Sequence, residues 1–304
     1  MRARKSTKTG WAFLAPAFAH LLAFALIPMG YAFYISLSKI NLFRGESKIV
    51  GFKNYALAFQ EASFWGALWN SFRYAAMSVP AGIAVALLVA ILVNQKLKGM
   101  TIYRTVFYVP AIASGIATAM LWIYIFLPDS GLINMTLQVV QKGIQPGVAK
   151  DQAWNINFLN QSEWAMPALA FMSIWTGLGP RMVLFIAGLI GIPAPLYEAA
   201  QLDGATSWKC FWKITVPMLT PTTLFVVITS TIGAMQVFTP IYLMTKGGPE
   251  YSTDVIGYHI YTEAWVNFNT GLASAKSFIL LAIIAVISLF QWKLMESRMD
   301  SISA

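Results

Sequence analysis

The stretch that decides the fold is EAAQLDGATSWKCFWKITVP, residues 198–217, a hydrophilic segment between two long apolar ones. Two prolines precede a run of good helix formers, and Gly204 is a permissive turn residue, so the pattern predicts a short helix that ends at Gly204. Residues 207–213 predict a second short helix, which Pro217 ends or kinks. Two short helices at an angle form a knob that fits a groove on another protein.

Composition places the chain among membrane proteins. Hydrophobic residues make up 58% of the 304 residues and charged residues only 11%, and the mean hydropathy is +0.62. A water-soluble chain of this length does not present so much apolar surface without aggregating. We therefore expect an integral membrane protein.

Six apolar segments are long enough to cross a bilayer, which takes about 20 mostly apolar residues. They cover residues 11–37, 72–93, 106–127, 164–190, 222–244 and 273–292. The first follows a basic amino terminus and imitates a signal peptide, but it is too long and too continuous for one, so we expect an uncleaved anchor. The expected fold class is all-α, a polytopic membrane protein with six transmembrane helices.

Basic residues in the short loops predict the orientation. Under a six-span count one side receives the amino terminus and the residues Lys96, Lys98, Arg104, Lys209, Lys213, Lys293 and Arg298. The positive-inside rule makes that side cytoplasmic, with both termini and the insert 198–217 on it. The other side receives residues 38–71, 128–163 and 246–272, which hold acidic residues such as Asp151. We expect a multi-pass protein of the cell membrane.

Several function classes are disfavoured by the sequence. The net charge is +9, but the basic residues stand at membrane boundaries and form no stripe with aromatics, which disfavours nucleic-acid binding. Cys210 is the single cysteine, which excludes an internal disulfide and a cysteine-based metal cluster. No phosphate-cradling G-x-x-x-x-G-K-[ST] pattern occurs. We expect no catalytic residue, no metal and no cofactor held by this chain.

The insert resembles the EAA signature of ABC-importer permeases, in which EAA, Gly, Ile, Leu and Pro recur at fixed spacing. The matching residues here are Glu198, Ala199, Ala200, Gly204, Ile214 and Pro217, and Val216 replaces the Leu. The resemblance implies that these residues, with Asp203, contact a cytoplasmic ATPase that binds ATP in place of this chain. An ordinary pair of surface helices is the alternative.

Further segments are similar to carbohydrate-uptake permeases of the maltose and glycerol-phosphate type. They include IWTGLGPRMVLFIAGLIGIP at 174–193, MTKGGP at 244–249 and GLASAKSFILLAII at 271–284. The resemblance implies a type I importer domain over residues 66–291 with a coupling insert at 194–217, an added helix within residues 1–65, and a tail at 292–304. It implies four partners: a second homologous permease, an ABC ATPase dimer, an extracytoplasmic solute-binding protein and a sugar.

In that family the sugar contacts come from the spans before and after the EAA motif. The resemblance and the polar neighbours in these spans point to Ser173, Thr176, Gly177, Ser230, Thr231 and Gln236. Serine and threonine equally suit a bond to a helix carbonyl or close helix packing. An amide expected in mid-span, at Gln236, favours a cavity because it is costly without partners. Trp122, Tyr124 and Trp175 suit sugar stacking or anchoring at the membrane interface.

Arg181 is the charged residue expected well inside a span. A guanidinium at that depth costs at least a few kcal/mol unless it is solvated or paired, and every Asp and Glu falls in an expected loop. We therefore expect Arg181 to face the translocation pathway. Snorkelling to the cytoplasmic headgroups is the alternative.

Other kinds of transporter fit parts of the same pattern. An ABC permease for glycerol phosphate or another small polar solute shares these motifs, and amino-acid or peptide permeases share the EAA motif. A secondary transporter belongs to a different class and is expected to carry inverted repeats and ionisable residues placed for ion coupling. We identify neither in this sequence.

Overall fold

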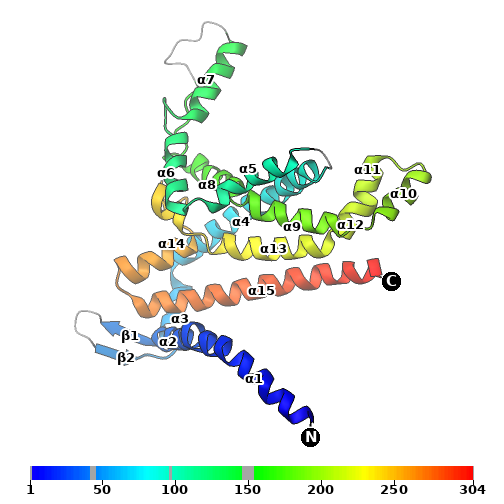
Figure 1. Cartoon of the computed structure of the whole chain (residues 1–304). Helices are drawn as coiled ribbons and strands as arrows, with labels where there is room; N and C mark the ends of the chain where they lie inside the picture. The colour runs from blue at the N-terminus through cyan, green and yellow to red at the C-terminus, as the bar shows by residue number, and fades with distance from the viewer. Residues whose placement is uncertain (1, 42–45, 96–97, 146–153, 304) are drawn as a thin grey trace. The chain divides into compact units, whose positions relative to one another are not determined.

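The computed structural model describes residues 2–41, 46–95, 98–145 and 154–303 (Figure 1). Lys96 and Asp151, two of the charged residues used to predict the orientation in the membrane, lie outside these residues. The chain divides into two compact units. The first, unit 1, comprises Met1–Phe64 and Ile260–Ala282, and the second, unit 2, comprises Trp65–His259 and Ile283–Ala304. The long helices α4 (Ala62–Val93) and α15 (Thr270–Ser303) contribute residues to both.

Unit 1 begins with a long apolar helix. Its elements are α1 (Arg2–Leu21), the π-helical turn η1 (Leu22–Leu26), α2 (Ile27–Ser36), strands β1 (Ser38–Asn41) and β2 (Glu46–Ile49), α3 (Lys53–Gln60) and the π-helical turn η5 (Thr262–Val266). Among the residues that the structure describes, none covers the 18-residue apolar window within Gly10–Ser36, of which 0% is buried. The side chain of Asn54 donates to the carbonyls of Ser36 and Ser38 at 2.8 and 3.0 Å, which holds α3 to the end of α2.

The expectation of an all-α chain is wrong for the segment after α2. Strands β1 and β2 pair antiparallel, with Ser38 opposite Ile49 and Lys39 opposite Lys48. Helix α2 ends at Ser36, and the backbone N–H groups of Val50 and Gly51 donate to the carbonyl of Leu37 at 2.8 and 3.0 Å. The hairpin thus satisfies backbone groups that the end of the helix leaves without partners.

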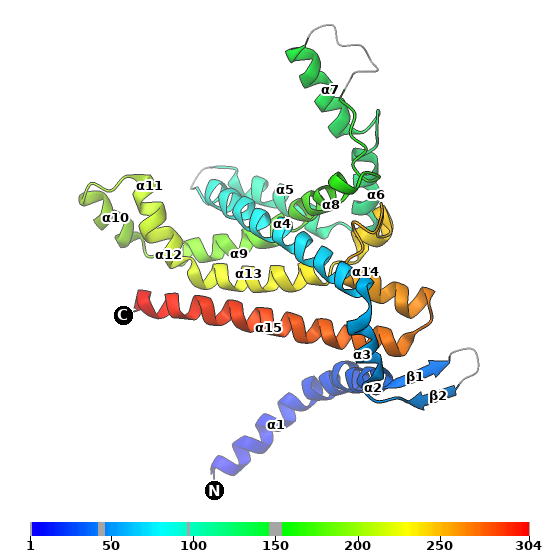
Figure 2. The ribbon, with the colours of Figure 1, turned by 180° about the vertical axis from the view of Figure 1, so that it is seen from behind.

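Unit 2 holds most of the remaining helices, which both views of the ribbon show (Figures 1 and 2). They are α5 (Met100–Ile112), α6 (Gly115–Ile125), α7 (Leu132–Ile144), α8 (Ser162–Thr176), α9 (Leu178–Ile190), α10 (Ala194–Leu202), α11 (Ser207–Cys210), the π-helical turn η3 (Phe211–Thr215), α12 (Val216–Met218), α13 (Thr220–Met235) and the π-helical turn η4 (Ile241–Thr245). The short helix α14 (Ile256–Tyr261) follows.

Three of the expected spans are continuous helices and three are bent. The continuous ones are Gly10–Ser36, Ala62–Val93 and Thr270–Glu296. The others are helix pairs: α5 with α6 at 98°, α8 with α9 at 49°, and α11–α12 with α13 at 65°. Counting each pair as one span gives up to six, by length and composition. At the sharpest break Ala113 is extended, with ψ 143°, which ends α5.

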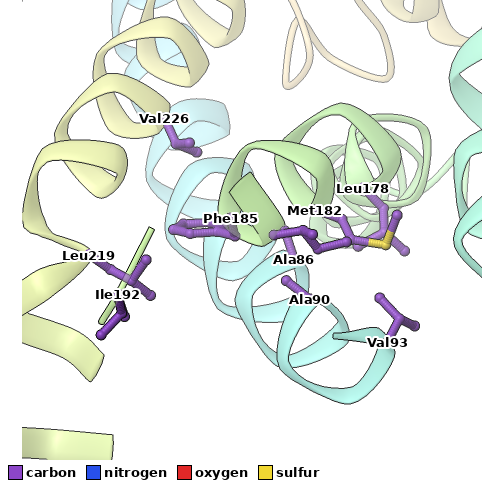
Figure 3. Close-up of a cluster of buried hydrophobic side chains, with 10 residues drawn as sticks. Ala86, Ala90, Val93, Leu178, Met182, Phe185, Ile192, Leu219 and Val226 are labelled. Carbon is purple, nitrogen blue, oxygen red and sulfur yellow. The ribbon is translucent and has the colours of Figure 1, made fainter. Parts of the chain in front are cut away.

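A buried apolar cluster joins α4 to α9 in unit 2 (Figure 3). Ala86 and Ala90 of α4, one turn apart, pack with Leu178, Met182 and Phe185 of α9. Residues three and four apart share one face of a helix, so one face of α9 is committed to this core. Arg181 of α9 lies outside the cluster.

Arg104 of α5 caps the end of α4. Its Nε and Nη2 atoms donate to the carbonyl of Val93 at 3.1 and 3.0 Å. A cation at the carboxyl end of a helix satisfies a carbonyl that lacks an intrahelical partner and complements the helix dipole. The contact links α5 to the end of α4.

Candidate functional site

A cavity of about 520 Å³ lies within unit 2. Its wall combines apolar side chains with hydroxyls and one guanidinium, and the elements that supply it are α4, α8, α9, α13 and the break between α5 and α6. The polar residues of the wall are Tyr74, Ser78, Thr118, Ser173, Thr176, Arg181, Thr229, Ser230 and Thr239. A concave, largely apolar site with a few convergent polar groups is the usual form of a small-molecule site.

The bend between α8 and α9 brings one group of these side chains to the cavity. Helix α8 ends at Thr176, Gly177 lies between the helices, and its N–H donates to the carbonyl of Ser173 at 3.0 Å. The hydroxyl of Thr176 donates to the same carbonyl at 3.2 Å. Ser173, Thr176, Gly177 and Arg181 all line the cavity. The interruption of the helix therefore gathers residues from two consecutive helices on one surface.

Arg181 extends from the first turn of α9 toward α13. Its Nε donates to the hydroxyl of Ser230 at 3.1 Å. Its Nη1 is buried and has no hydrogen-bond partner among the described residues. A buried donor without a partner costs roughly 1–3 kcal/mol, and more when the group is charged. The described part of the chain thus leaves this donor without a partner, and Arg181 also lines the cavity.

Tyr74 and Ser78 of α4 add hydroxyls to the same wall, although they are not among the residues predicted from the sequence. The hydroxyls of Tyr74 and Ser173 are hydrogen-bonded to each other, and Ser78 donates to the carbonyl of Tyr74 at 2.8 Å. The signal was present in the sequence, because two polar residues four apart in a helix lie on one face. This face of α4 points to the cavity.

Two residues expected at the pathway lie elsewhere. The hydroxyl of Thr231 accepts a hydrogen bond from Nε2 of Gln291 at 3.0 Å, and Thr231 is not part of the cavity wall. Gln236 is exposed and follows the last residue of α13, and it is absent from the same wall. Because α13 ends at Met235, Gln236 stands at the end of this helix, and its role in the pathway stays a prediction.

Two of the three aromatic residues considered for stacking, Trp122 and Trp175, pack against each other. Trp122 is buried, and its ring lies 5.5 Å from that of Trp175 in an edge-to-face arrangement. Phe126 and Phe171 also contact Trp122. Tyr124 is exposed. None of the three candidates, Trp122, Tyr124 and Trp175, belongs to the described wall of the cavity.

The insert forms two short helical segments separated by a tight turn. Helix α10 ends at Leu202 and is followed by Asp203, then by Gly204 at φ +73°. The N–H of Ala205 donates to the carbonyl of Ala200 at 2.9 Å across this turn. A positive φ favours glycine because a side chain would crowd the backbone. Glu198, Ala199 and Ala200 belong to α10, and Glu198 and Ala199 are exposed.

The second segment is anchored at both ends. The hydroxyl of Thr206 accepts from the N–H of Lys209 at 3.3 Å and so caps α11. Further along, Ile214 lies in η3 and Pro217 in α12. The hydroxyls of Tyr197 and Thr215 are 2.8 Å apart, which ties α10 to the end of η3. The two segments therefore hold one geometry relative to each other.

Known proteins resemble the chain over almost its whole length. It is 35% identical to the probable ABC transporter permease protein YesP of Bacillus subtilis (strain 168), over 95% of this chain and 91% of that protein. It is 31% identical to the sn-glycerol-3-phosphate transport system permease protein UgpA of Rhizobium meliloti (strain 1021), over 94% of both.

Solved structures of ABC transporters share the fold of this chain. One chain of a bacterial ABC transporter involved in the import of the acidic polysaccharide alginate superposes with a TM-score of 0.81 at 26% identity, covering 98% of this chain and 99% of that one. A second structure holds the alginate transporter in complex with a periplasmic protein bound to an alginate pentasaccharide, with a TM-score of 0.80 at 25% identity and the same coverage. The fold is thus that of a type I ABC importer permease.

The sequence profile of one family matches residues 65–300, which include the cavity wall and the insert. The chain therefore belongs to the family of binding-protein-dependent transport system inner membrane components.

Proposed function

We propose that this chain is the permease subunit of an ATP-driven importer and forms half of a transmembrane pathway for a sugar or oligosaccharide. The single observation that carries the proposal is the cavity of about 520 Å³ with its hydroxyl groups from α4, α8 and α13. Hydroxyls that can donate and accept suit the hydroxyls of a carbohydrate. The relationship to the permease of an alginate importer supports the same class of cargo.

Five of the residues expected from the sequence form the proposed substrate pathway. They are Ser173, Thr176, Gly177, Arg181 and Ser230, and all of them line the cavity. Ser173 and Ser230 already engage protein partners, Tyr74 and Arg181. These hydroxyls can exchange or share those partners when a sugar enters, so the site binds without leaving buried polar groups unpaired. Thr231 and Gln236 have no place in the proposed wall.

The insert is the proposed contact with a cytoplasmic ATPase. In this proposal Glu198, Ala199, Ala200, Asp203 and Gly204 form its tip, while Ile214 and Pro217 hold the following segment. Exposed apolar side chains support the assignment, since Leu202 is 90% and Trp208 70% exposed. Large exposed apolar groups next to a rigid turn are typical of a docking surface. ATP would be bound by the partner, and the chain itself would be a transport subunit without an ATPase site.

The remaining partners and the orientation follow from the same proposal. The transport domain would cover residues 66–291, pair with a second homologous permease and receive cargo from an extracytoplasmic solute-binding protein, within membrane lipid. The structure of a relative with a periplasmic protein supports the last partner. Both termini and the insert 194–217 would lie in the cytoplasm, since the Lys and Arg residues of the short loops gather on that side.

Import of glycerol phosphate is a second candidate. The guanidinium of Arg181 in the cavity favours it, because guanidinium groups bind phosphate well. The UgpA relatives carry this cargo in their names. Both candidates use the same cavity and the same partners.

Uptake measurements in a strain that lacks the gene test the proposal. Radiolabelled neutral oligosaccharides, acidic oligosaccharides and sn-glycerol 3-phosphate are supplied separately, and the full-length gene is returned on a plasmid. We expect uptake of at least one cargo to fall on deletion and to return on complementation. Unchanged uptake of every cargo by the deletion strain would contradict the proposal.

A further inference from the structure

Arg181 carries the one permanent charge among the described residues that line the cavity. A guanidinium keeps its proton in proteins, so the charge is present at any physiological pH. The wall contains hydroxyl groups but no Asp or Glu among those residues. The cavity is therefore electropositive, whereas a site built for an uncharged sugar needs only neutral donors and acceptors.

Two glycines from different helices make room for the guanidinium. A Cβ atom on Gly177 would lie 2.8 Å from Nη1 and 2.9 Å from Cζ of Arg181. A Cβ atom on Gly82 of α4 would overlap Nη1 and would lie 3.2 Å from Cζ. Real Cβ atoms do not approach other heavy atoms so closely. The group is thus seated in a slot between α4 and the α8–α9 bend rather than extended along the surface.

The seated guanidinium has unused binding capacity. Ser230 accepts from Nε, which sets the plane of the group, while Nη1 is buried without a partner among the described residues. Guanidinium donors are arranged as a planar fork that matches the two oxygens of a carboxylate or phosphate. Hydrogen bonds between two ionised groups are roughly twice as strong as neutral ones. An anionic oxygen pair bound at the guanidinium from the cavity would compensate its charge.

We infer that the cargo of this permease carries an anionic group, a carboxylate or a phosphate, and that Arg181 binds it during passage. The inference rests on the proposed function and assigns the class of substrate to the same cavity. The hydroxyls of Tyr74, Ser173 and Thr176 would contact the neutral part of the same molecule.

Lipid phosphate is the other source of the same chemistry. The slot argues against it, because snorkelling requires the side chain to extend toward the headgroups, whereas Gly82 and Gly177 enclose its end and Ser230 binds its Nε. The two sources differ in one measurable respect. A lipid phosphate would support passage of every cargo alike, while a cargo anion makes the effect of Arg181 depend on the cargo.

The experiment uses the complete importer with its partner subunits and binding protein, expressed in cells. Initial uptake rates are measured for digalacturonate, for sn-glycerol 3-phosphate and for neutral galactobiose and maltose. The variants are Arg181→Gln, Arg181→Lys and Gly82→Ala, with Gly66→Ala as the matched control because it lies on the same helix α4 and a Cβ there meets nothing within 4 Å. The amount of complex in the membrane is measured for each.

We expect wild-type uptake of one of the two acidic cargoes, which identifies the anion as carboxylate or phosphate. Arg181→Gln should lower that uptake about tenfold or more, the usual effect of losing a hydrogen bond between charged groups. Arg181→Lys should retain more of it. Gly82→Ala should lower it by displacing the guanidinium, and Gly66→Ala should leave it unchanged.

Three results would overturn the inference while the proposed function stands. The first is that the wild-type importer takes up neutral sugars only. The second is that Arg181→Gln leaves the uptake of acidic cargo intact. The third is that Arg181→Gln lowers acidic and neutral uptake equally, which is expected if Arg181 binds a lipid or the second permease. If Arg181→Gln fails to reach the membrane, the inference is tested with Gly82→Ala instead, by comparing its effects on acidic and on neutral uptake. Uptake of no cargo at all would contradict the proposed function itself.

Discussion

The Nζ atom of Lys276 lies 2.6 Å from a carboxylate oxygen of Glu61, a residue 215 positions earlier in the chain. The same ammonium lies 3.0 Å from a carboxylate oxygen of Glu263. Lys276 is 0% exposed. All three residues belong to unit 1, where they link the end of α3, the turn η5 and the start of α15. Neither charge pattern nor spacing marks this triad in the sequence.

Replacement of Lys276 by Met should destabilise the protein strongly. Removing one partner from a buried ion pair leaves an uncompensated charge and costs about 3–5 kcal/mol. Thermal unfolding of the purified chain in detergent measures the loss. Lys98→Met is the matched control, because Lys98 is exposed. Adding Glu61→Gln and Glu263→Gln to Lys276→Met should restore stability if uncompensated carboxylates cause the loss. Wild-type stability of Lys276→Met alone would refute this explanation.

The same triad should make stability depend on pH. Burial opposes ionisation of Glu263, but hydrogen bonds from Asn269 and Lys276, with the Lys276 charge, hold the pKa of Glu263 below its usual 4.5. Because the pKa is lower in the folded state, the ionised group stabilises the fold above 4.5, and this contribution is lost as the pH falls through the lowered pKa.

Comparison with Glu263→Gln isolates that contribution. Unfolding midpoints of wild type and variant are measured between about pH 7 and about pH 3. The difference between them should be largest near neutral pH and should shrink in acid. A difference that grows as the pH falls would contradict a lowered pKa of Glu263 in the folded state.

Gly204→Asp should uncouple transport from the ATPase. The φ of +73° at Gly204 is unfavourable for a residue with a side chain, by roughly 1–2 kcal/mol, so the turn between α10 and α11 should rearrange. Transport and cargo-stimulated ATP hydrolysis should fall while the protein still inserts. Gly204→Asn is the matched control for charge, because Asn and Asp tolerate a positive φ similarly and differ in the ionised carboxylate. Full transport with normal ATPase co-purification in Gly204→Asp would remove the insert from the coupling role.

Reporter fusions test the orientation. A reporter after Lys98 or Lys213 should show cytoplasmic activity, and one after Pro249 should show extracytoplasmic activity, because of the Lys and Arg bias. A further fusion after Lys150, which lies outside the described residues, should also be extracytoplasmic. An extracytoplasmic signal at Lys213 would place the insert on the wrong side for a cytoplasmic ATPase.

The sequence predicted the helical segments and a large part of the cavity. Apolar length identifies spans regardless of how they pack. Ser173, Thr176 and Ser230 were predicted from the resemblance to carbohydrate-uptake permeases, and Arg181 was predicted because it is a charged residue in an apolar segment. The bends were not predicted. The 98° turn between α5 and α6 depends on the extended backbone at Ala113, and neither Ala113 nor Ser114 has a residue type that demands such a conformation.

Long-range pairings account for the other omissions. Gly82 looks like any small residue of a membrane helix until Arg181, 99 positions later in the chain, is placed beside it. Hydropathy alone also does not reveal that α13 ends at Met235, next to Gln236. Such features follow from tertiary contacts, which periodicity and composition do not specify.

Uptake by proteoliposomes tests the central claim most directly. The permease is reconstituted with its partner permease and ATPase, the solute-binding protein loaded with radiolabelled cargo is added outside, and ATP is enclosed inside. We expect cargo to accumulate only when ATP and the binding protein are both present, and to stop when ATP is replaced by a non-hydrolysable analogue. Accumulation that proceeds without ATP and instead follows an ion gradient would contradict the account and indicate a secondary transporter.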